Sequence, residues 1–184
     1  VKYGGDLSVG SYGIANSVAV VFVMFVMGLN QGMQPIAGYN YGSQQIDRLM
    51  QVVKLSIISA TCIMTVGWLI AMFIPEQCAR LFTTDPELIK LSSRAIRINM
   101  ICFPVIGFQM VTTNFFQCIG KAKLSIFLSL SRQLLFLLPL IAVLPRYFGV
   151  DGVWFSLPTA DAIAAVVASI LMTSFMRKLK KQTV

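Results

Sequence analysis

Long apolar segments separated by short polar ones run through the whole sequence. No charged side chain occurs between Leu7 and Ile46, and further uncharged runs cover 55–75 and 98–120. About 20 apolar residues in an α-helix are enough to cross the hydrocarbon core of a bilayer. The pattern therefore predicts an all-α membrane protein, with helices over about 7–32, 50–75, 86–120, 124–144 and 153–176.

The first apolar run is too long for a single span. As one helix its 40 residues would reach about 60 Å, roughly twice the thickness of the hydrocarbon core. Proline disrupts the helical hydrogen bonding, and glycine adopts backbone conformations that other residues avoid. We therefore expect the first helix to end near Gly32, with a helix-break motif formed by Gly28, Gly32, Pro35, Gly38, Asn40 and Gly42.

Amide side chains are concentrated beside the expected break and beside a proline in the third span. Gln31 and Gln34 lie in the break, whereas Gln109 and Asn114 follow Pro104, where we expect a kink. Lipid offers no hydrogen-bond partners, so these amides must face protein or water. An apolar cavity with a few amides suits varied amphipathic ligands. We therefore expect these four amides to line a substrate cavity, with ordinary helix packing as the alternative for each.

Arg132 and Asp161 are the only charged residues well inside the predicted spans. A charge at the centre of a bilayer costs about 2.5–3.5 kcal/mol, so each should face the interior of the bundle. Counted from the helix ends, their depths differ by about 10 Å at 1.5 Å per residue. A direct ion pair is therefore one possibility, and separate partners are another. Either both charges are structural, or Asp161 binds or relays a coupling cation.

Composition supports a membrane protein and argues against several other classes. The chain is 57% hydrophobic and 12% charged, and a soluble domain carries about twice that share of charge. It has no histidine, and Cys62, Cys78, Cys102 and Cys118 form no C-x-x-C pair, so we expect no metal site, no cofactor and small buried thiols. Neither H-E-x-x-H nor paired intramembrane carboxylates occur, so an intramembrane enzyme is disfavoured.

The net charge of +8 comes from basic residues at the ends of the apolar segments. They form no stripe with interleaved aromatic residues, so nucleic-acid binding is disfavoured. The basic cluster Arg177–Lys181 and the short basic turn at Lys121 are typical of cytoplasmic ends, which predicts a cytoplasmic C-terminus. The chain begins with Val1 and shows no signal peptide there, so we expect it to be part of a longer protein.

The stretch Gly32-Met-Gln-Pro-Ile-Ala-Gly-Tyr-Asn-Tyr-Gly42, followed by Arg48, resembles the multidrug and toxin extrusion (MATE) transporters. It is most similar to their bacterial branch with DinF-like and MepA-like proteins. Further matches follow in the same order along nearly the whole chain: Gly4-Gly5-Asp6, Leu81-Phe82-Thr83, Phe116-Gln117, Ser131-Arg132-Gln133 and Gly152-Val-Trp154.

This resemblance implies a twelve-helix exporter built from two six-helix lobes, of which the chain would form most of the C-terminal lobe. It implies a bacterial inner-membrane antiporter that exports cationic or amphipathic organic compounds in exchange for H⁺ or Na⁺. Its partners would be those compounds, the lipid bilayer and the missing N-terminal lobe. The best-known coupling carboxylate of this branch lies on the first helix, which this chain does not include.

Two alternatives to an exporter stay open from the sequence. One is a lipid-linked oligosaccharide flippase of the same superfamily, which would need several basic residues in its cavity. Arg132 is the only basic residue deep in a predicted span. The other is a membrane scaffold or a fragment without transport activity, because five helices alone would expose a surface meant for another lobe.

Overall fold

The computed structural model describes the backbone of residues 6–182 and the side chains of residues 7–145 and 152–179. The Gly4-Gly5 motif and the side chains of Asp6, Lys180 and Lys181 therefore lie outside the described residues. All elements in this range are helical: α1 (Asp6–Gly42), α2 (Ile46–Phe73), α3 (Pro75–Arg80), α4 (Pro86–Asn99), α5 (Phe103–Cys118), α6 (Ala122–Leu130), the π-helix η1 (Ser131–Leu137) and α7 (Leu138–Gln182).

By length and composition, the described helices include four apolar segments that could each cross a membrane and a bent pair that would form a fifth, where the sequence predicts five crossings. Four segments are long and apolar enough by themselves, namely Leu7–Gly42, Ile46–Phe73, Ala122–Pro145 and Gly152–Leu179. The fifth consists of α4 and α5, which meet at an angle of 53°. The kink expected near Pro104 is confirmed, since α5 begins at Phe103 with this proline in its first turn.

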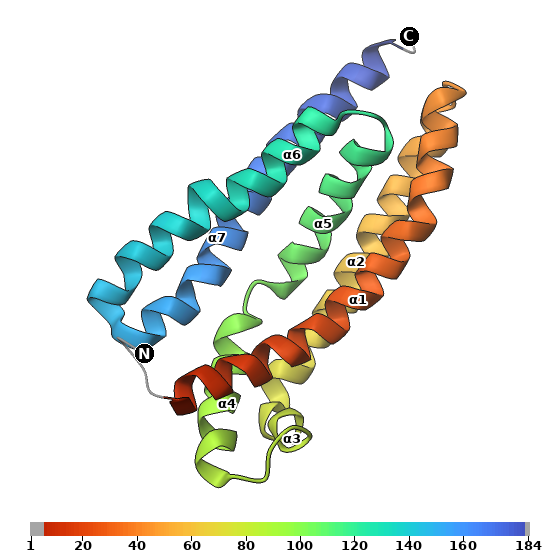
Figure 1. The fold of residues 1–184 in the computed structure, drawn as a ribbon. Helices are drawn as coiled ribbons and strands as arrows, with labels where there is room; N and C mark the ends of the chain where they lie inside the picture. The colour runs from red at the N-terminus through yellow and green to blue at the C-terminus, as the bar shows by residue number, and fades with distance from the viewer. Residues whose placement is uncertain (1–5, 183–184) are drawn as a thin grey trace.

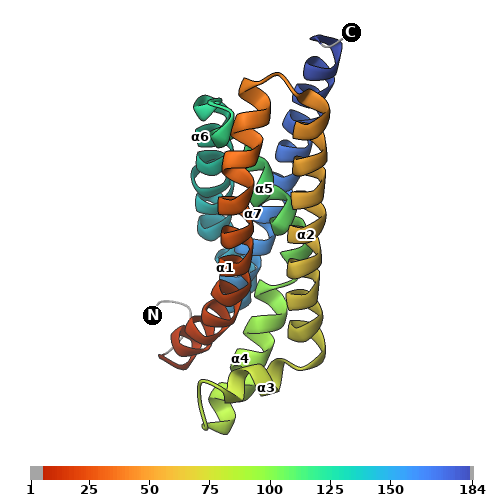
Figure 2. The same cartoon turned by 90° about the vertical axis from the view of Figure 1, so that its right-hand side faces the viewer.

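The crossings alternate in direction along the bundle. In Figure 1, α1 rises, α2 descends, α4 and α5 rise again, and α6 descends with η1. Figure 2 shows the same order from the side. The α1–α2 turn, the α5–α6 turn and the last turns of α7 therefore lie at one end of the bundle. We call this the C-terminal end.

Helix α7 folds back on itself near Pro145. Its first residues continue the line of η1, whereas the arm after Gly152 returns toward the C-terminal end (Figure 1). A Cβ atom on Gly152 would lie 2.5 Å from the carbonyl oxygen of Leu144, so only glycine fits this reversal. The turn expected at 145–152 is therefore present, although its backbone is helical throughout.

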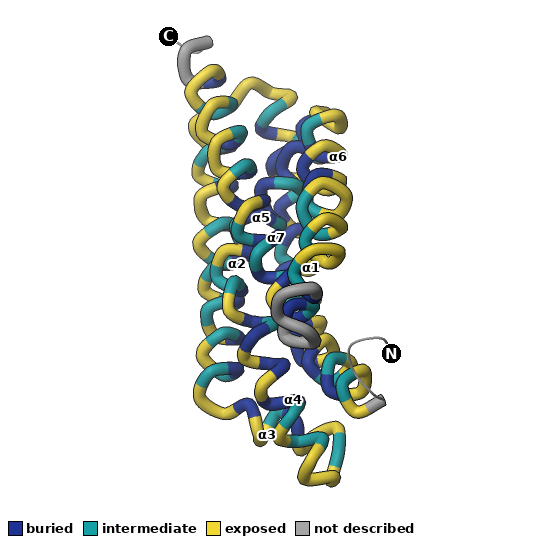
Figure 3. Tube along the Cα trace, turned by 90° about the vertical axis from the view of Figure 1, so that its left-hand side faces the viewer, coloured by how far each residue is buried: buried dark blue, intermediate teal, exposed yellow. Residues whose placement is uncertain are grey.

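Close helix packing around α5 forms the core. A Cβ atom on Gly107 would lie 2.8 Å from the carbonyl oxygen of Ala60, so α5 and α2 approach with backbone against backbone. On another face of α5, Phe115 and Phe116 pack against Phe175 of α7, with ring centroids 6.0 and 5.4 Å away. Buried residues face this interior, while the outer faces of the bundle are largely exposed (Figure 3).

The predicted break in the first helix is wrong, because α1 continues to Gly42 with Pro35 inside it. One proline removes one helical hydrogen bond, whereas ending the helix within a bilayer would leave several backbone groups without partners. The length of α1 beyond a single membrane span therefore requires no break. Figure 2 shows that α1 bends in its N-terminal part instead. None of the glycines in the motif has a positive φ. Among the described residues, Gly120 is the only glycine that does.

Three smaller expectations also differ from the structure. Helix α2 begins at Ile46 rather than near 50, and the segment 86–120 is divided at Met100–Cys102. All four cysteines are free, but Cys62 is exposed on the outer face of α2 and the other three are half-buried.

Candidate functional site

Arg132 and Asp161 form an ion pair within the bundle. The Arg132 Nε donates to Asp161 Oδ1 at 2.5 Å, which joins η1 to the returning arm of α7. The Asp161 side chain is 6% exposed, whereas that of Arg132 is 36% exposed. The carboxylate is therefore enclosed by the bundle, and the arginine lies at its border.

The π-helix presents Arg132 toward α7. At its end the Leu138 N–H donates to the Gln133 carbonyl, five residues back, so the turn is wider than an α-helical one. Pro139 follows directly, has no N–H to donate, and clashes with the carbonyl four residues before it. The wide turn relieves this clash, and such π segments often occur at functional sites.

The pairing also corrects the depths counted from the sequence. Counting each depth from the end of its predicted helix treats Leu124 and Met176 as level, and this leaves a gap of about 10 Å between the two charges. In the structure α7 continues to Gln182 and extends beyond the start of α6 (Figure 1). Asp161 therefore lies closer to the level of Arg132 than the count suggests.

Two further side chains lie within the electrostatic range of Asp161. They are Tyr12 of α1 and Cys102, which stands between α4 and α5. Next to Arg132, the hydroxyl of Ser131 is buried and has no hydrogen-bond partner. The ion pair thus occupies a polar centre reached by α1, the α4–α5 joint, η1 and α7. We call this the Asp161 centre.

The four predicted cavity amides separate into three environments. Gln34 Nε2 donates to Asn114 Oδ1 at 2.9 Å, which joins α1 to α5 across 80 residues of sequence. Gln109 is 4% exposed and its Oε1 has no partner, whereas Gln31 is exposed. No pocket described for this part of the chain includes any of the four.

The other residues of the motif lie on a regular helix. A Cβ atom would meet nothing within 4 Å at Gly28, Gly32 and Gly42, whereas at Gly38 it would lie 3.6 Å from the Cys118 carbonyl oxygen of α5. Asn40 donates back to the Ile36 carbonyl at 2.7 Å. Within the described residues, Gly28 and Gly32 therefore do not form the close helix contact that their spacing would permit.

Two further polar residues in the same region are not among the predicted cavity amides. Asn30 and Thr112 are buried, and Asn30 Oδ1 and Thr112 Oγ1 have no partner. Asn30 lies one turn before Gln34 on α1, and Thr112 lies three residues after Gln109 on α5. A search for polar residues one turn from the chosen amides would have found both.

Replacing Gln34 and Asn114 by leucine tests whether their hydrogen bond holds α1 against α5. Interhelical hydrogen bonds in membranes contribute about 0.6 kcal/mol on average and less than about 2 kcal/mol. We therefore expect a coupling energy of about 1 kcal/mol in a double-mutant cycle, measured by unfolding of the full-length protein. Strictly additive effects of the two single substitutions would show that the pair contributes nothing.

Chemically, the Asp161 centre combines a buried carboxylate with a single paired arginine. A carboxylate in this position can hold a proton or a small cation when the arginine moves away, whereas the amides along α1 and α5 offer only neutral hydrogen bonds. No group of three or more metal-ligating side chains occurs among the described residues.

Comparison with known proteins places these features in a family. The MatE family model matches residues 1–143 of the chain. The multidrug export protein MepA of Staphylococcus haemolyticus is 25% identical over 95% of this chain and 38% of its own length. The chain thus spans less than half the length of this relative.

Solved structures agree with the fold. A structure of the MATE multidrug transporter DinF-BH in complex with rhodamine 6G matches with a TM-score of 0.82 and 38% identity, over 94% of this chain and 39% of that one. A crystal structure of a MATE protein in the bent conformation matches with a TM-score of 0.91 and 23% identity, over 98% and 40%. With its helical crossings and this family match over most of its length, the chain belongs to the MatE family of membrane transporters.

Proposed function

We propose that the full-length protein is a secondary active antiporter that exports cationic or amphipathic organic compounds in exchange for H⁺ or Na⁺. The observation that carries this proposal is the 38% identity with DinF-BH, a multidrug transporter whose structure contains rhodamine 6G, over 94% of this chain. The described helices would then form most of one lobe, and the remaining helices would complete the transport route.

The Asp161 centre supports coupling to a cation. In our proposal, the incoming cation binds the carboxylate and weakens its attraction to Arg132. Release of the cation restores the ion pair. A flippase for polyanionic head groups is less well supported, because Arg132 is paired with an acid and offers no net positive charge.

The distribution of basic residues supports a cytoplasmic C-terminal end in the bacterial inner membrane. Lys121 and Lys123 stand at the α5–α6 turn, and Arg177 and Lys178 stand in the last turns of α7, all toward the C-terminal end of the bundle (Figure 1). Basic residues are retained on the cytoplasmic side during membrane insertion. A tag fused to the C-terminus should therefore be protected from protease in intact cells.

Transport by the full-length protein in proteoliposomes tests the proposed function. Rhodamine 6G is supplied with a proton gradient, with a sodium gradient or with neither. We expect rhodamine 6G to move against its own concentration gradient only when a proton or a sodium gradient is present. Equal transport in all three conditions, or none in any, would contradict antiport.

Substitution of Asp161 by asparagine tests the proposed coupling role in the same assay. The amide keeps the size of the side chain but carries no charge, so we expect at least about a tenfold loss of gradient-driven transport, or about 1.4 kcal/mol. Glu87→Gln is the matched control, because Glu87 is exposed in the first turn of α4. An unchanged dependence on the ion gradient in Asp161→Asn would remove this residue from the mechanism.

A further inference from the structure

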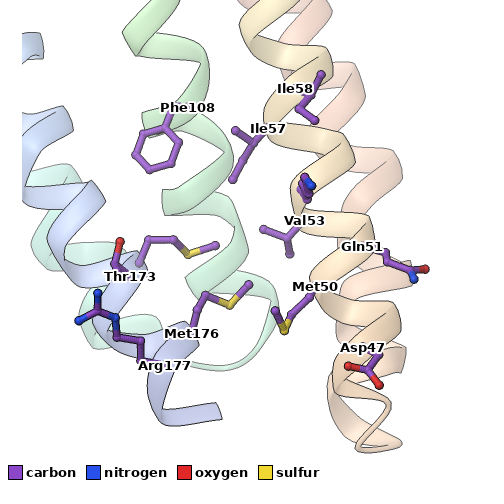
Figure 4. A pocket seen from close by; sticks show the side chains of 12 residues that line it. Asp47, Met50, Gln51, Val53, Ile57, Ile58, Phe108, Thr173, Met176 and Arg177 are labelled. Carbon is purple, nitrogen blue, oxygen red and sulfur yellow. The ribbon is translucent and has the colours of Figure 1, made fainter. Parts of the chain in front are cut away.

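A groove runs along the bundle between α2 and the returning arm of α7, with α5 as its floor. It has a volume of about 890 Å³ and does not include the Asp161 centre. Figure 4 shows Ile57 and Ile58 on the α2 side, Phe108 on α5, and Thr173, Met176 and Arg177 on the α7 side.

The walls of this groove are apolar along most of its length. Toward the middle of the bundle they consist of Ile57, Ile58, Phe108 and Met172. Nearer the C-terminal end, Met50 and Met176 point toward one another from opposite walls (Figure 4). Methionine side chains are flexible and polarizable, so they adapt to irregular apolar partners such as acyl chains.

Basic side chains line both walls of the groove. Lys54 belongs to α2 and Arg177 to α7, and both are exposed. Neither forms an ion pair with a described residue, and Asp47 is the single acidic residue of the lining. Lysine and arginine extend along apolar surface while keeping their charge at the membrane interface. The groove therefore combines an apolar channel with unneutralised positive charge, and we call the part lined by Lys54 and Arg177 its mouth.

We propose that this groove binds an anionic phospholipid, with its phosphate between Lys54 and Arg177 and an acyl chain along Ile57, Ile58 and Phe108. Basic pockets between membrane helices on the cytoplasmic side bind anionic head groups by charge. Asp47 adds one negative charge at the mouth, which favours a head group with a single phosphate over a more highly charged one. The ligand class is a monoanionic phospholipid such as phosphatidylglycerol.

An anionic phospholipid matches both the apolar walls and the charged mouth of the groove, whereas other occupants match only one of them. A soluble anion would use the two basic residues but not the apolar length of the groove. A neutral lipid would fill the apolar length but gain nothing from the charges. A helix from the rest of the full-length protein would fill the groove permanently and exclude lipid.

Native mass spectrometry of the full-length transporter tests the proposal. The protein is exchanged into an equal mixture of phosphatidylglycerol and phosphatidylcholine, and the bound lipids are counted. We expect phosphatidylglycerol to be enriched at least about fivefold, and the double variant Lys54→Gln with Arg177→Gln to lose this enrichment. The control, Lys121→Gln with Lys123→Gln, removes the same charge at the same end of the bundle but outside the groove.

A second variant tests the apolar part separately. Ile58→Trp narrows the groove without changing its charges, and it should reduce bound lipid of both kinds at least about threefold. Equal enrichment in the wild-type protein and in the Lys54/Arg177 variant would overturn the proposal, as would equal losses in that variant and in its control. Absence of bound lipid from the wild-type protein would also overturn it.

Discussion

Replacing Asp161 by alanine in the full-length protein will lower its free energy of unfolding by about 3 kcal/mol. The substitution leaves the Arg132 guanidinium at the border of the bundle with no carboxylate to accept from its Nε. We place the effect at the low end of the range for buried pairs because the Arg132 side chain is 36% exposed. Thermal unfolding of the purified protein in detergent measures the loss.

The double variant Arg132→Met with Asp161→Leu provides the control. It removes both charges and replaces them with apolar side chains, so we expect it to regain most of the stability that Asp161→Ala loses. If the double variant is as unstable as the single one, the packing of these two side chains matters more than their charges. The stability measurement is independent of the transport assay, so it separates a structural role from a coupling role.

Gly107→Ala will also destabilise the protein, by about 1–3 kcal/mol. The added Cβ atom would lie 2.8 Å from the Ala60 carbonyl oxygen and 3.2 Å from Met64 Cγ, so α5 would have to move away from α2. The closest contact is with backbone, and no rotation of a side chain relieves it. Unfolding of the full-length protein measures the cost.

Gly28→Ala is the matched control on α1. A Cβ atom there would meet nothing within 4 Å among the described residues. Alanine favours a helix over glycine by about 0.5–1 kcal/mol, so we expect this variant to be at least as stable as the wild type. If both substitutions destabilise the protein to the same extent, the close packing of α5 against α2 does not explain the effect of Gly107→Ala.

The number and approximate positions of the crossings could be predicted from the sequence because they depend on local composition. A run such as 55–75 is apolar over a full membrane thickness, whatever its neighbours are. The kink near Pro104 is local in the same sense. The continuity of α1 does not depend on local composition in this way. A proline is compatible with a continuous or a broken helix, and the free-energy cost of unpaired backbone groups in lipid decides between them.

The candidate site could be predicted only in part, because its contacts join distant elements. The sequence identified Arg132 and Asp161 as costly intramembrane charges, but their pairing depends on how far α7 extends beyond α6. Similarly, Gln34 and Asn114 were chosen as single amides, and nothing in their spacing showed that one would bind the other. The lining role of all four amides stays a prediction.

The bent joint between α4 and α5 lies beside the Asp161 centre. The two helices meet at 53°, and only turn-type hydrogen bonds cross Met100–Cys102, where Cys102 lies within range of the Asp161 charge. With α5 16 residues long, a rotation of about 10° at this hinge would displace its far tip by about 4 Å. In the proposed antiport, a proton or ion bound at the carboxylate would act beside this hinge, and α5 would carry the movement toward the C-terminal end of the bundle.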